Sequence, residues 1–236
     1  MTDKPFADQV ALVTGASRGI GAATAKLLGA AGAHVILTAR TAAGLEEVEE
    51  AIFAAGGSAT IAPLDLTENE SISRLAGAVA DRWQALDMLV LNAASLGSLS
   101  TVSAIDFKEF AKVLTLNVTA QAAILAAFDP MLRKARGARV LGITSSVGRT
   151  PRAYWGMYGA SKAAFENLVL SYGEEVYHVS NVRAAILDPG ATRTKMRARA
   201  FPGEDPQKVK APEVVADRIA ALMASGFDTG HYERIE

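Results

Sequence analysis

A glycine-rich turn between an apolar run and a helical segment constrains this sequence most. The run Val10–Thr14 is followed by Gly15, Gly19 and Gly21 in the pattern TGxxxGxG, and a helical run begins at Ala22. Gly15 allows the chain to turn sharply out of a strand, and the other two glycines let the backbone approach a pyrophosphate while the helix packs closely on a sheet. The free N–H groups at the helix N-terminus then face the phosphates. The pattern predicts a dinucleotide site, and the alternative is a glycine turn without a ligand.

Six short apolar runs alternate with segments of helical length along the chain. The runs are apolar almost throughout, as strands covered on both faces of a parallel sheet should be. They are Val10–Thr14, His34–Thr38, Ala59–Pro63, Met88–Asn92, Arg139–Thr144 and Val182–Leu187. This alternation predicts an α/β fold, a single-domain Rossmann-type doubly wound parallel sheet over residues 1–236, flanked by helices on both faces.

The least regular stretch, Gly190–Ala211, begins where the sixth run ends and contains Pro202, Gly203 and Pro206. Ligands bind beyond the carboxyl ends of strands in an open parallel sheet. We therefore predict that residues 190–211 form a substrate lid, and the alternative is a surface insertion without a role.

The composition excludes several classes of function. The 236 residues include no cysteine, which removes disulfides, thiolate metal sites and cysteine nucleophiles. A net charge of −1 gives no electrostatic footprint for nucleic acid, and the three histidines are too scattered to suggest a metal site. The longest apolar stretch, around Ala122–Phe128, is short for a membrane span, and Met1–Gln9 lacks the apolar part of a signal peptide. We expect a soluble cytoplasmic protein that binds no metal, nucleic acid or membrane.

Tyr158 and Lys162 form a second chemical pattern. Their spacing puts both side chains on one face of a helix. A free tyrosine has a pKa of about 10 and is a poor base near neutrality. A nearby ammonium stabilises the phenolate, so we expect Lys162 to lower the pKa of Tyr158. A Tyr-x-x-x-Lys pattern by itself is more often a solvated pair on a helix surface.

The pair is not alone, because Ser145 leaves the fifth run 13 positions before Tyr158. Together with TGxxxGxG, this spacing resembles the short-chain dehydrogenase/reductase family. The resemblance implies that Ser145 polarises the substrate oxygen, that Tyr158 transfers a proton and that Lys162 also binds the nicotinamide ribose. Asn117 resembles the fourth catalytic residue of the family, which holds a water that links the lysine to solvent. Ser146 is the close alternative to Ser145, and a mid-helix asparagine is more often structural.

The resemblance also implies a set of cofactor contacts from the glycine turn to the lid entrance. Asp65 resembles the residue that meets the adenine amino group, Asn92 begins the strand end beside the ribose, and Asp188–Thr192 resembles the segment that contacts the nicotinamide carboxamide. The residues implied to contact the cofactor are Gly15, Ser17, Arg18, Gly19, Ile20, Gly21, Arg40, Thr41, Asp65, Leu66, Asn92, Ala93, Ala94, Tyr158, Lys162, Pro189, Gly190 and Thr192.

The sequence departs from the family pattern at a few positions. Leu91 and Ala94 replace the first Asn and the Gly of the Asn-Asn-Ala-Gly strand end, and Ala185 stands where many relatives have Asn. Thr229-Gly230 resembles the start of the last strand, but the usual terminal Asp-Gly-Gly is missing. These departures concern ribose contact and assembly more than chemistry.

The end of the second run indicates which nicotinamide cofactor would bind. An NAD site is expected to carry an acid here, which accepts hydrogen bonds from the ribose 2′-hydroxyl. No Asp or Glu occurs between Ala33 and Gly44, whereas Arg40 follows this run and Arg18 lies in the glycine turn. Two guanidiniums can make charge-assisted bonds to a 2′-phosphate. The pair favours NADP(H), and the alternative is that both arginines are solvated surface residues.

These patterns predict an NADP(H)-dependent oxidoreductase that transfers a hydride between nicotinamide and a carbonyl or alcohol substrate. The main alternative is a nucleotide-binding redox sensor or scaffold without turnover, which would predict damage among the four catalytic residues. A sugar-nucleotide epimerase on the same fold would usually be longer. The segments Ala111–Phe128 and Tyr158–Val176 are richer in Ala and Leu than one sheet face requires, so we expect a homodimer or homotetramer.

Two groups of residues bear on the small-molecule substrate. Tyr154, Trp155 and Met157 flank Tyr158, and they either line the substrate pocket or belong to the core. Six cations are expected near the mouth of the site, where they would attract an anionic substrate unless they point to solvent. They are Arg149, Arg152, Arg193, Lys195, Arg197 and Arg199.

Overall fold

The computed structural model describes residues 4–236, and a sheet of seven strands runs through this part of the chain. All neighbouring strands pair in parallel, in the order β3-β2-β1-β4-β5-β6-β7. The strands are β1 (Val10–Thr14), β2 (His34–Ala39), β3 (Ser58–Pro63), β4 (Met88–Leu91), β5 (Arg139–Ile143), β6 (Arg183–Asp188) and β7 (Tyr232–Arg234). The six predicted runs are all strands, each end within one residue of its prediction, and the parallel α/β fold is confirmed.

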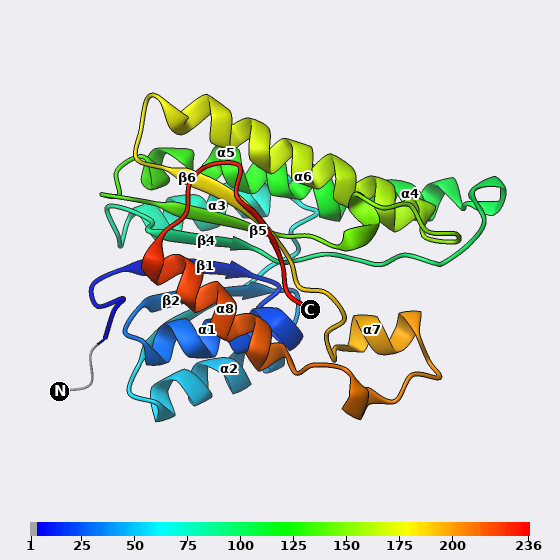
Figure 1. The fold of residues 1–236 in the computed structure, drawn as a ribbon. Helices are drawn as coiled ribbons and strands as arrows, with labels where there is room; N and C mark the ends of the chain where they lie inside the picture. Colours follow the sequence, from blue (N-terminus) through cyan, green and yellow to red (C-terminus); the bar gives the residue numbers. More distant parts are fainter. Residues whose placement is uncertain (1–3) are drawn as a thin grey trace.

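Helices cover both faces of this sheet (Figure 1). One face packs against α1 (Gly19–Ala30), α2 (Ala42–Ala54) and α8 (Pro212–Ser225), and the other against α3 (Asn69–Ala80), α5 (Ala120–Leu132) and α6 (Gly156–Tyr177). The short helix α4 (Phe107–Leu114) precedes α5, and α7 (Lys195–Ala200) lies beyond the carboxyl ends of the strands (Figure 1).

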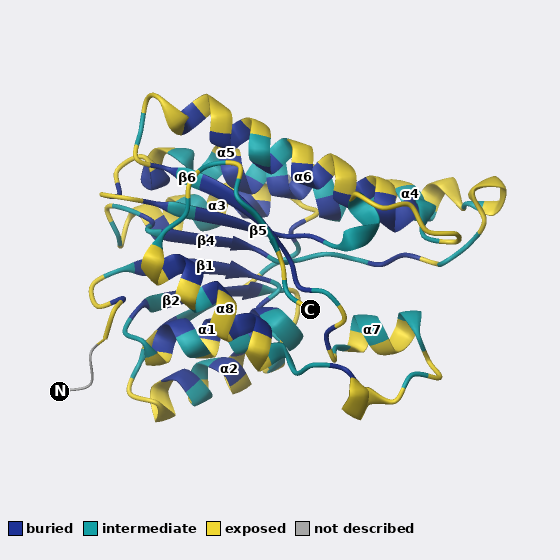
Figure 2. Cartoon of the chain, viewed as in Figure 1, coloured by how far each residue is buried: buried dark blue, intermediate teal, exposed yellow. Residues whose placement is uncertain are grey.

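Most residues of β1 to β6 are apolar because their side chains alternate between two cores. In β1, Leu12 belongs to the core under α3, α5 and α6, whereas Ala11 and Val13 belong to the core under α1, α2 and α8. All three are fully buried, as is most of the sheet (Figure 2). Full burial of a leucine side chain contributes about 1.5–3 kcal/mol to folding, so these runs tolerate few polar residues except at their carboxyl ends.

The strand order reverses direction between β1 and β4, which are neighbours although two strands separate them in sequence. The chain therefore leaves β1 and β4 toward opposite faces of the sheet, and in folds of this kind ligands bind outside the carboxyl ends of the strands at such a point. The glycine turn follows β1 and Asn92 follows β4, so both predicted segments lie at this point.

A longer helix than the sequence suggested runs from α4 through a π-helical turn, Thr115–Thr119, into α5. In the described chain this helix, Phe107–Leu132, is long and apolar enough to cross a membrane by length and composition, and a third of its apolar window is buried. The expectation that no segment reaches this length, based on Ala122–Phe128, was wrong. Residues of α5 such as Phe128 lie in the core beside α3 and α6, as in a helix that covers a sheet.

Candidate active site

The glycine turn between β1 and α1 leaves no room for side chains. Gly15 and Gly19 have φ angles of +66° and +58°, in the left-handed region that favours glycine. At Gly21, a Cβ would collide with the carbonyl oxygen of Gly15 and lie 2.5 Å from Nδ2 of Asn92. Over its described first turn α1 has no acidic side chain, and Arg18 before it makes no side-chain cap. The N–H groups of this helix start are therefore available to an anion, which fits the phosphates of a dinucleotide.

Thr14 and Asn92 join the ends of β1 and β4 beneath this turn. The Thr14 hydroxyl accepts hydrogen bonds from the backbone N–H groups of Asn92, at 2.9 Å, and of Ala93, at 3.0 Å. The Asn92 amide nitrogen donates to the carbonyls of Thr14, at 2.9 Å, and of Gly15, at 3.3 Å. Asn92 therefore commits its amide nitrogen to holding the glycine turn, and Ala93 is engaged as well, because its carbonyl accepts from the side chain of Gln121 at 3.2 Å.

The predicted 2′-phosphate residues lie on adjacent loops. Arg18 and Arg40 are exposed, and neither forms an ion pair in residues 4–236. A Cβ at Gly44, near the start of α2, would lie 3.0 Å from Cβ of Ser17, so the glycine turn contacts the segment that follows Arg40 and Thr41. This corner carries two free guanidiniums, which suits a phosphate monoester.

Two residues after β3, Asp65 and Leu66, differ in what they can offer a ligand. Asp65 accepts hydrogen bonds from the backbone N–H and the hydroxyl of Thr67, and chiefly the former lowers the pKa of this carboxyl. Leu66 is buried in the core, so only its backbone is available to a ligand. Asp65 therefore remains an ionised acceptor at the carboxyl edge, as the predicted adenine contact requires.

Helix α6 places Tyr158 and Lys162 on one face, and both are buried. The Lys162 ammonium donates to the carbonyl of Ile143 at 2.8 Å and lies 5.8 Å from the centroid of the Tyr158 ring. Burial lowers the pKa of Lys162 to about 8, against the opposing negative charge of Glu166. Burial also raises the pKa of Tyr158, and the charge of Asp188 adds to this effect. The expected lowering of the tyrosine pKa by Lys162 was wrong for the protein alone, because burial and the charge of Asp188 both raise this pKa.

Asn117 lies in the π-helical turn Thr115–Thr119 and its side chain is fully engaged. Its amide oxygen accepts from the backbone N–H of Ser95 at 2.8 Å, and its amide nitrogen donates to the Ser95 carbonyl and the Ser161 hydroxyl, each at 2.9 Å. Ser161 in turn donates to the carbonyl of Tyr158 at 2.7 Å. Asn117 therefore holds the first turn of the catalytic helix, and its predicted role with a water stays a prediction.

Ser145 follows the carboxyl end of β5 and enters a tight turn, Ser146–Gly148. Its carbonyl accepts from the backbone N–H of Gly148 at 2.9 Å. Gly148 packs on α6 at the level of Lys162, since a Cβ there would lie 3.2 Å from the carbonyl carbon of Lys162. The turn that carries Ser145 thus lies directly against the helix that carries the tyrosine and the lysine.

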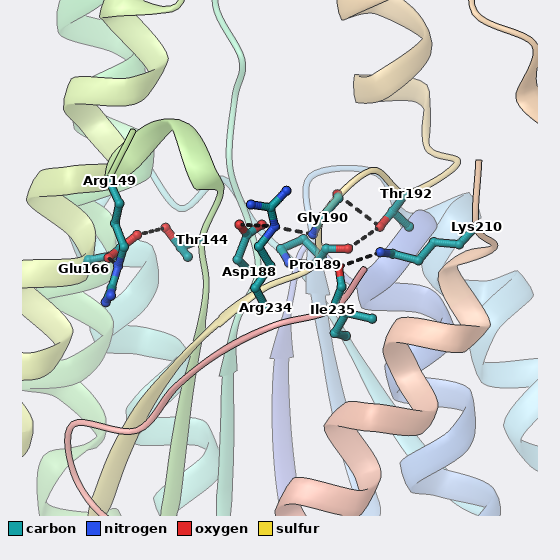
Figure 3. Close-up of polar contacts among 10 residues, drawn as sticks. All are labelled: Thr144, Arg149, Glu166, Asp188, Pro189, Gly190, Thr192, Lys210, Arg234 and Ile235. Atoms are coloured by element: carbon teal, nitrogen blue, oxygen red, sulfur yellow. Dashed lines mark hydrogen bonds and ion pairs between the residues drawn. The ribbon is translucent and has the colours of Figure 1, made fainter. Parts of the chain in front are cut away.

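The segment after β6 is held in a fixed turn (Figure 3). The Asp188 carboxylate accepts from the backbone N–H of Gly190 at 2.9 Å, and the Thr192 hydroxyl donates to the carbonyl of Pro189 at 2.9 Å. Gly190 has a φ of +59°, and a Cβ there would collide with the carbonyl oxygen of Ile235. The predicted nicotinamide segment is therefore rigid before any ligand binds.

The predicted lid, residues 190–211, contacts two other segments of the site. Its ends lie together, because Arg193 donates its backbone N–H to the carbonyl of Lys210 at 2.8 Å. Thr194 reaches the glycine turn, where a Cβ at Gly19 would lie 3.3 Å from its methyl group. Farther along, the Phe201 ring stacks on Trp155 with 5.7 Å between centroids. Residues 190–211 therefore reach from the glycine turn to the start of α6, and their role as a lid stays a prediction.

The three residues that flank Tyr158 differ in role. Met157 is buried, like Tyr158 itself, so both of its predicted roles stay open. Trp155 is half-buried and meets the Tyr158 ring edge-on at 6.1 Å between centroids, so it forms a wall between the tyrosine and the lid. Tyr154 is 60% exposed and has a φ of +72°, which is uncommon for an aromatic residue.

Two of the six predicted cations are already paired. Arg149 bonds Glu166 at 2.6 Å, and Arg197 forms two hydrogen bonds with Glu204. Arg152 instead lies 5.7 Å from the Trp155 ring centroid and lines a cavity of about 260 Å³. The positive field at the mouth is therefore weaker than six free cations would give.

Comparison with known proteins shows which family has this fold and these motifs. The family model for short chain dehydrogenases matches residues 9–205. The chain belongs to the short chain dehydrogenase family. It is 37% identical, over 92% of this chain and 86% of the relative, to the uncharacterized oxidoreductase YciK of Escherichia coli strain K12. It is an oxidoreductase of this family.

Solved structures of the family share the whole fold. A short chain dehydrogenase from Pseudomonas syringae superposes with a TM-score of 0.94 at 37% identity, covering 98% of this chain and 96% of the other. One from Shigella flexneri 2a strain 301, complexed with NADP, gives a TM-score of 0.92 at 34% identity, covering 99% of each chain. Short chain dehydrogenases of such identity share the sheet order and helix layers seen here.

Some residues that shape this short chain dehydrogenase site were missed at the sequence level. The Thr14 hydroxyl joins the ends of β1 and β4, and the Ser161 hydroxyl joins Asn117 to the first turn of α6. No sequence spacing identifies either residue. Glu166 could have been found, because it lies four residues beyond Lys162 and thus on the same helix face as Tyr158. A carboxylate on that helix face must either be exposed to solvent or find hydrogen-bond partners among the buried residues around the site.

Proposed function

We propose that this chain is an NADP(H)-dependent oxidoreductase that interconverts a carbonyl and an alcohol, with Tyr158 as the proton-transferring group. The observation that carries the proposal is the buried Tyr158–Lys162 pair on α6, with the turn that follows Ser145 packed against the same helix. These groups lie at the same edge of the sheet as a glycine turn built for phosphates. A scaffold without turnover would not need the buried pair.

NADPH, when bound, supplies the hydride. Tyr158 donates the proton to the carbonyl oxygen, and its raised pKa keeps the phenol protonated at neutral pH for that step. The Ser145 hydroxyl donates a hydrogen bond to the same oxygen as charge develops there. Lys162 keeps its charge below a pKa of about 8 and stabilises the phenolate that remains. Asn117 and Ser161 hold the helix turn that presents Tyr158.

The choice of NADP(H) over NAD(H) is supported by Arg18 and Arg40. Both are exposed and unpaired beside the glycine turn, where an acid would repel a 2′-phosphate. A relative of 34% identity has been solved with NADP bound, and its fold covers this whole chain. The same corner in this chain therefore suits the phosphorylated cofactor.

The test is NADPH oxidation, followed by its absorbance, with a panel of aldehydes and ketones that includes 4-nitrobenzaldehyde. We expect turnover by the unmodified protein and a loss of at least about a hundredfold in Tyr158→Phe, since general acid catalysis typically contributes that much. Calorimetric titration of both proteins with NADPH is the control, because the phenol is not needed for phosphate binding. Tight NADPH binding without turnover of any probe would favour the redox sensor or scaffold.

We extend the proposal to a homo-oligomer. The outer faces of α5 and α6 expose small residues, among them Ala126, Ala160 and Ala164. Only a third of the apolar window in Phe107–Leu132 is buried within one chain. A second copy that packs on these helices would cover this surface around a two-fold axis. The cytoplasmic location stays a prediction.

An anionic substrate is the finer proposal, and it rests on Arg152. This guanidinium lines a cavity of about 260 Å³ together with Arg234 and Ser146, close to the turn that carries Ser145. The paired probes are 4-carboxybenzaldehyde and the neutral methyl 4-formylbenzoate. We expect Arg152→Ala to lower kcat/KM for the charged probe alone, by an amount that shrinks as salt rises. Equal losses for both probes would exclude an anion-binding role.

A further inference from the structure

A buried carboxylate lies one helical turn beyond Lys162. Glu166 shares its helix face with Tyr158 and Lys162, and its side chain is 7% exposed. A carboxylate is costly to bury unless it is hydrogen-bonded and paired. Here one oxygen accepts from the Thr144 hydroxyl at 2.6 Å and the other from Nε of Arg149 at 2.6 Å. Both bonds are short and charge-assisted, the stronger class of hydrogen bond.

The two partners of Glu166 bracket the catalytic serine. Thr144 directly precedes Ser145, and Arg149 directly follows the turn Ser146–Gly148. Figure 3 shows Thr144 and Arg149 pointing at the same carboxylate. One side chain of the catalytic helix therefore ties down both ends of the segment that carries Ser145.

The segment fits closely between its anchors. A Cβ at Gly148 would lie 3.1 Å from Oε1 of Glu166, and a Cβ at Gly159 would lie 2.7 Å from the carbonyl oxygen of Val147. On the outer side, the Arg149 guanidinium lies 3.5 Å from the centroid of the Tyr232 ring in β7. Arg149, at the end of this segment, is thus held by Glu166 and by the Tyr232 ring, and the backbone in the middle of the segment packs on α6.

We propose that Glu166 is a positioning residue for Ser145, which sets the serine hydroxyl relative to Tyr158 by holding Thr144 and Arg149. The inference rests on the proposed function, in which Ser145 polarises the substrate oxygen. Catalysis depends on such placement, because a displacement of about 1 Å can cost about a hundredfold in rate. Glu166 itself touches neither substrate nor cofactor in this proposal.

A double-mutant cycle with 4-nitrobenzaldehyde and NADPH tests the coupling. Glu166→Gln keeps the shape of the side chain but loses the charge that holds both partners. We expect it to lower kcat about tenfold to a hundredfold, with the NADPH dissociation constant unchanged in calorimetry. In a Ser145→Ala background the same substitution should change kcat less than about twofold, because residues that act as a unit are not additive.

Two control variants and two possible outcomes separate the causes. Glu174→Gln, on an exposed part of the same helix two turns later, should leave kcat unchanged. Thr144→Val removes one of the two bonds and should show an intermediate loss. If Glu166→Gln kept its full effect on kcat without the Ser145 hydroxyl at a pH where Lys162 is protonated in both variants, the proposal would be overturned, because the effect would not pass through the serine. If the unmodified protein turned over no carbonyl probe, the proposed function would fail instead.

Hydrogen exchange tests the same inference without turnover. The backbone N–H groups of Gly148, Arg149 and Thr150 donate to carbonyls inside the turn. Glu166→Gln should speed their exchange by about tenfold or more while peptides from β6 stay protected, since local opening requires only the loss of local contacts. Unchanged exchange in the turn, or faster exchange throughout the sheet, would refute a positioning role.

Discussion

Substitution of Gly21 by alanine tests most directly whether the glycine turn between β1 and α1 binds the cofactor. Its backbone is ordinary, so alanine fits the local conformation, and the effect comes from contact alone. The new Cβ would collide with the carbonyl oxygen of Gly15 and lie 2.5 Å from Nδ2 of Asn92. Carbon contacts are optimal near 3.5–4.0 Å, so the turn must open by roughly 1 Å.

The stability change can be worked from these contacts. Overpacking costs typically about 1–3 kcal/mol, and strain on the two Asn92 hydrogen bonds adds about 1 kcal/mol. Alanine in a helix returns about 1 kcal/mol relative to glycine. The net loss is therefore about 1–3 kcal/mol, which lowers Tm by roughly 2–4 °C per kcal/mol in a chain of this size. NADPH affinity should fall by more than about tenfold, because the N–H groups of the turn move.

Gly77→Ala is the matched control. Gly77 lies inside α3, and a Cβ there meets nothing within 4 Å. This variant should gain about 0.5–1 kcal/mol of stability with unchanged NADPH binding. Thermal unfolding and calorimetric titration of both variants are the measurements. If Gly21→Ala were as stable as Gly77→Ala and bound NADPH like the unmodified protein, this role of the glycine turn would be refuted.

Three further predictions follow from the site and the helix surface. Arg40→Asp should reverse the preference for NADPH over NADH, which we expect to be at least about tenfold in the unmodified protein; equal affinities of the unmodified protein in calorimetry would contradict the assignment. The kcat for reduction should fall as pH rises through about 8, where the Lys162 ammonium loses its proton while Tyr158 stays protonated; a profile that stays flat well above this pH would show that the lysine charge is not needed. Light scattering at micromolar concentration should return a multiple of the 24.7 kDa chain mass, and a monomer would exclude the pairing of α5 and α6.

The fold could be predicted because its signals are local. Each of the first six strands is an apolar run, and side chains such as Leu12 and Val13 must be apolar to enter the two cores. The seventh strand, Tyr232–Arg234, has three residues and half-buried or exposed side chains, so no apolar run marks it. The helix around Ala111–Phe128, with Asn117 inside it, could also be predicted, but the structure extends it at both ends and places Asn117 in a π turn that no spacing marks.

The site could be predicted only as far as spacing fixes geometry. Spacing placed Tyr158 and Lys162 on one helix face and Ser145 at a strand end, and the structure brings them together. Spacing does not show how deeply a side chain is buried, so the predicted direction of the Tyr158 pKa shift was wrong. Spacing also says nothing of partners: Arg149, predicted to meet an anionic substrate, pairs instead with Glu166 across 17 positions of sequence.

Two acidic side chains near α6 affect the pKa values of Tyr158 and Lys162, and both effects bear on the direction of the proposed reaction. Asp188 adds to the raised pKa of Tyr158, which favours the protonated phenol, whereas Glu166 opposes the loss of charge from Lys162. Reduction needs a tyrosine that starts protonated beside a lysine that stays cationic, and oxidation needs a tyrosine that starts as phenolate. In the protein alone, burial and Asp188 both penalise the phenolate, so the arrangement suits proton donation to a carbonyl more than proton removal from an alcohol.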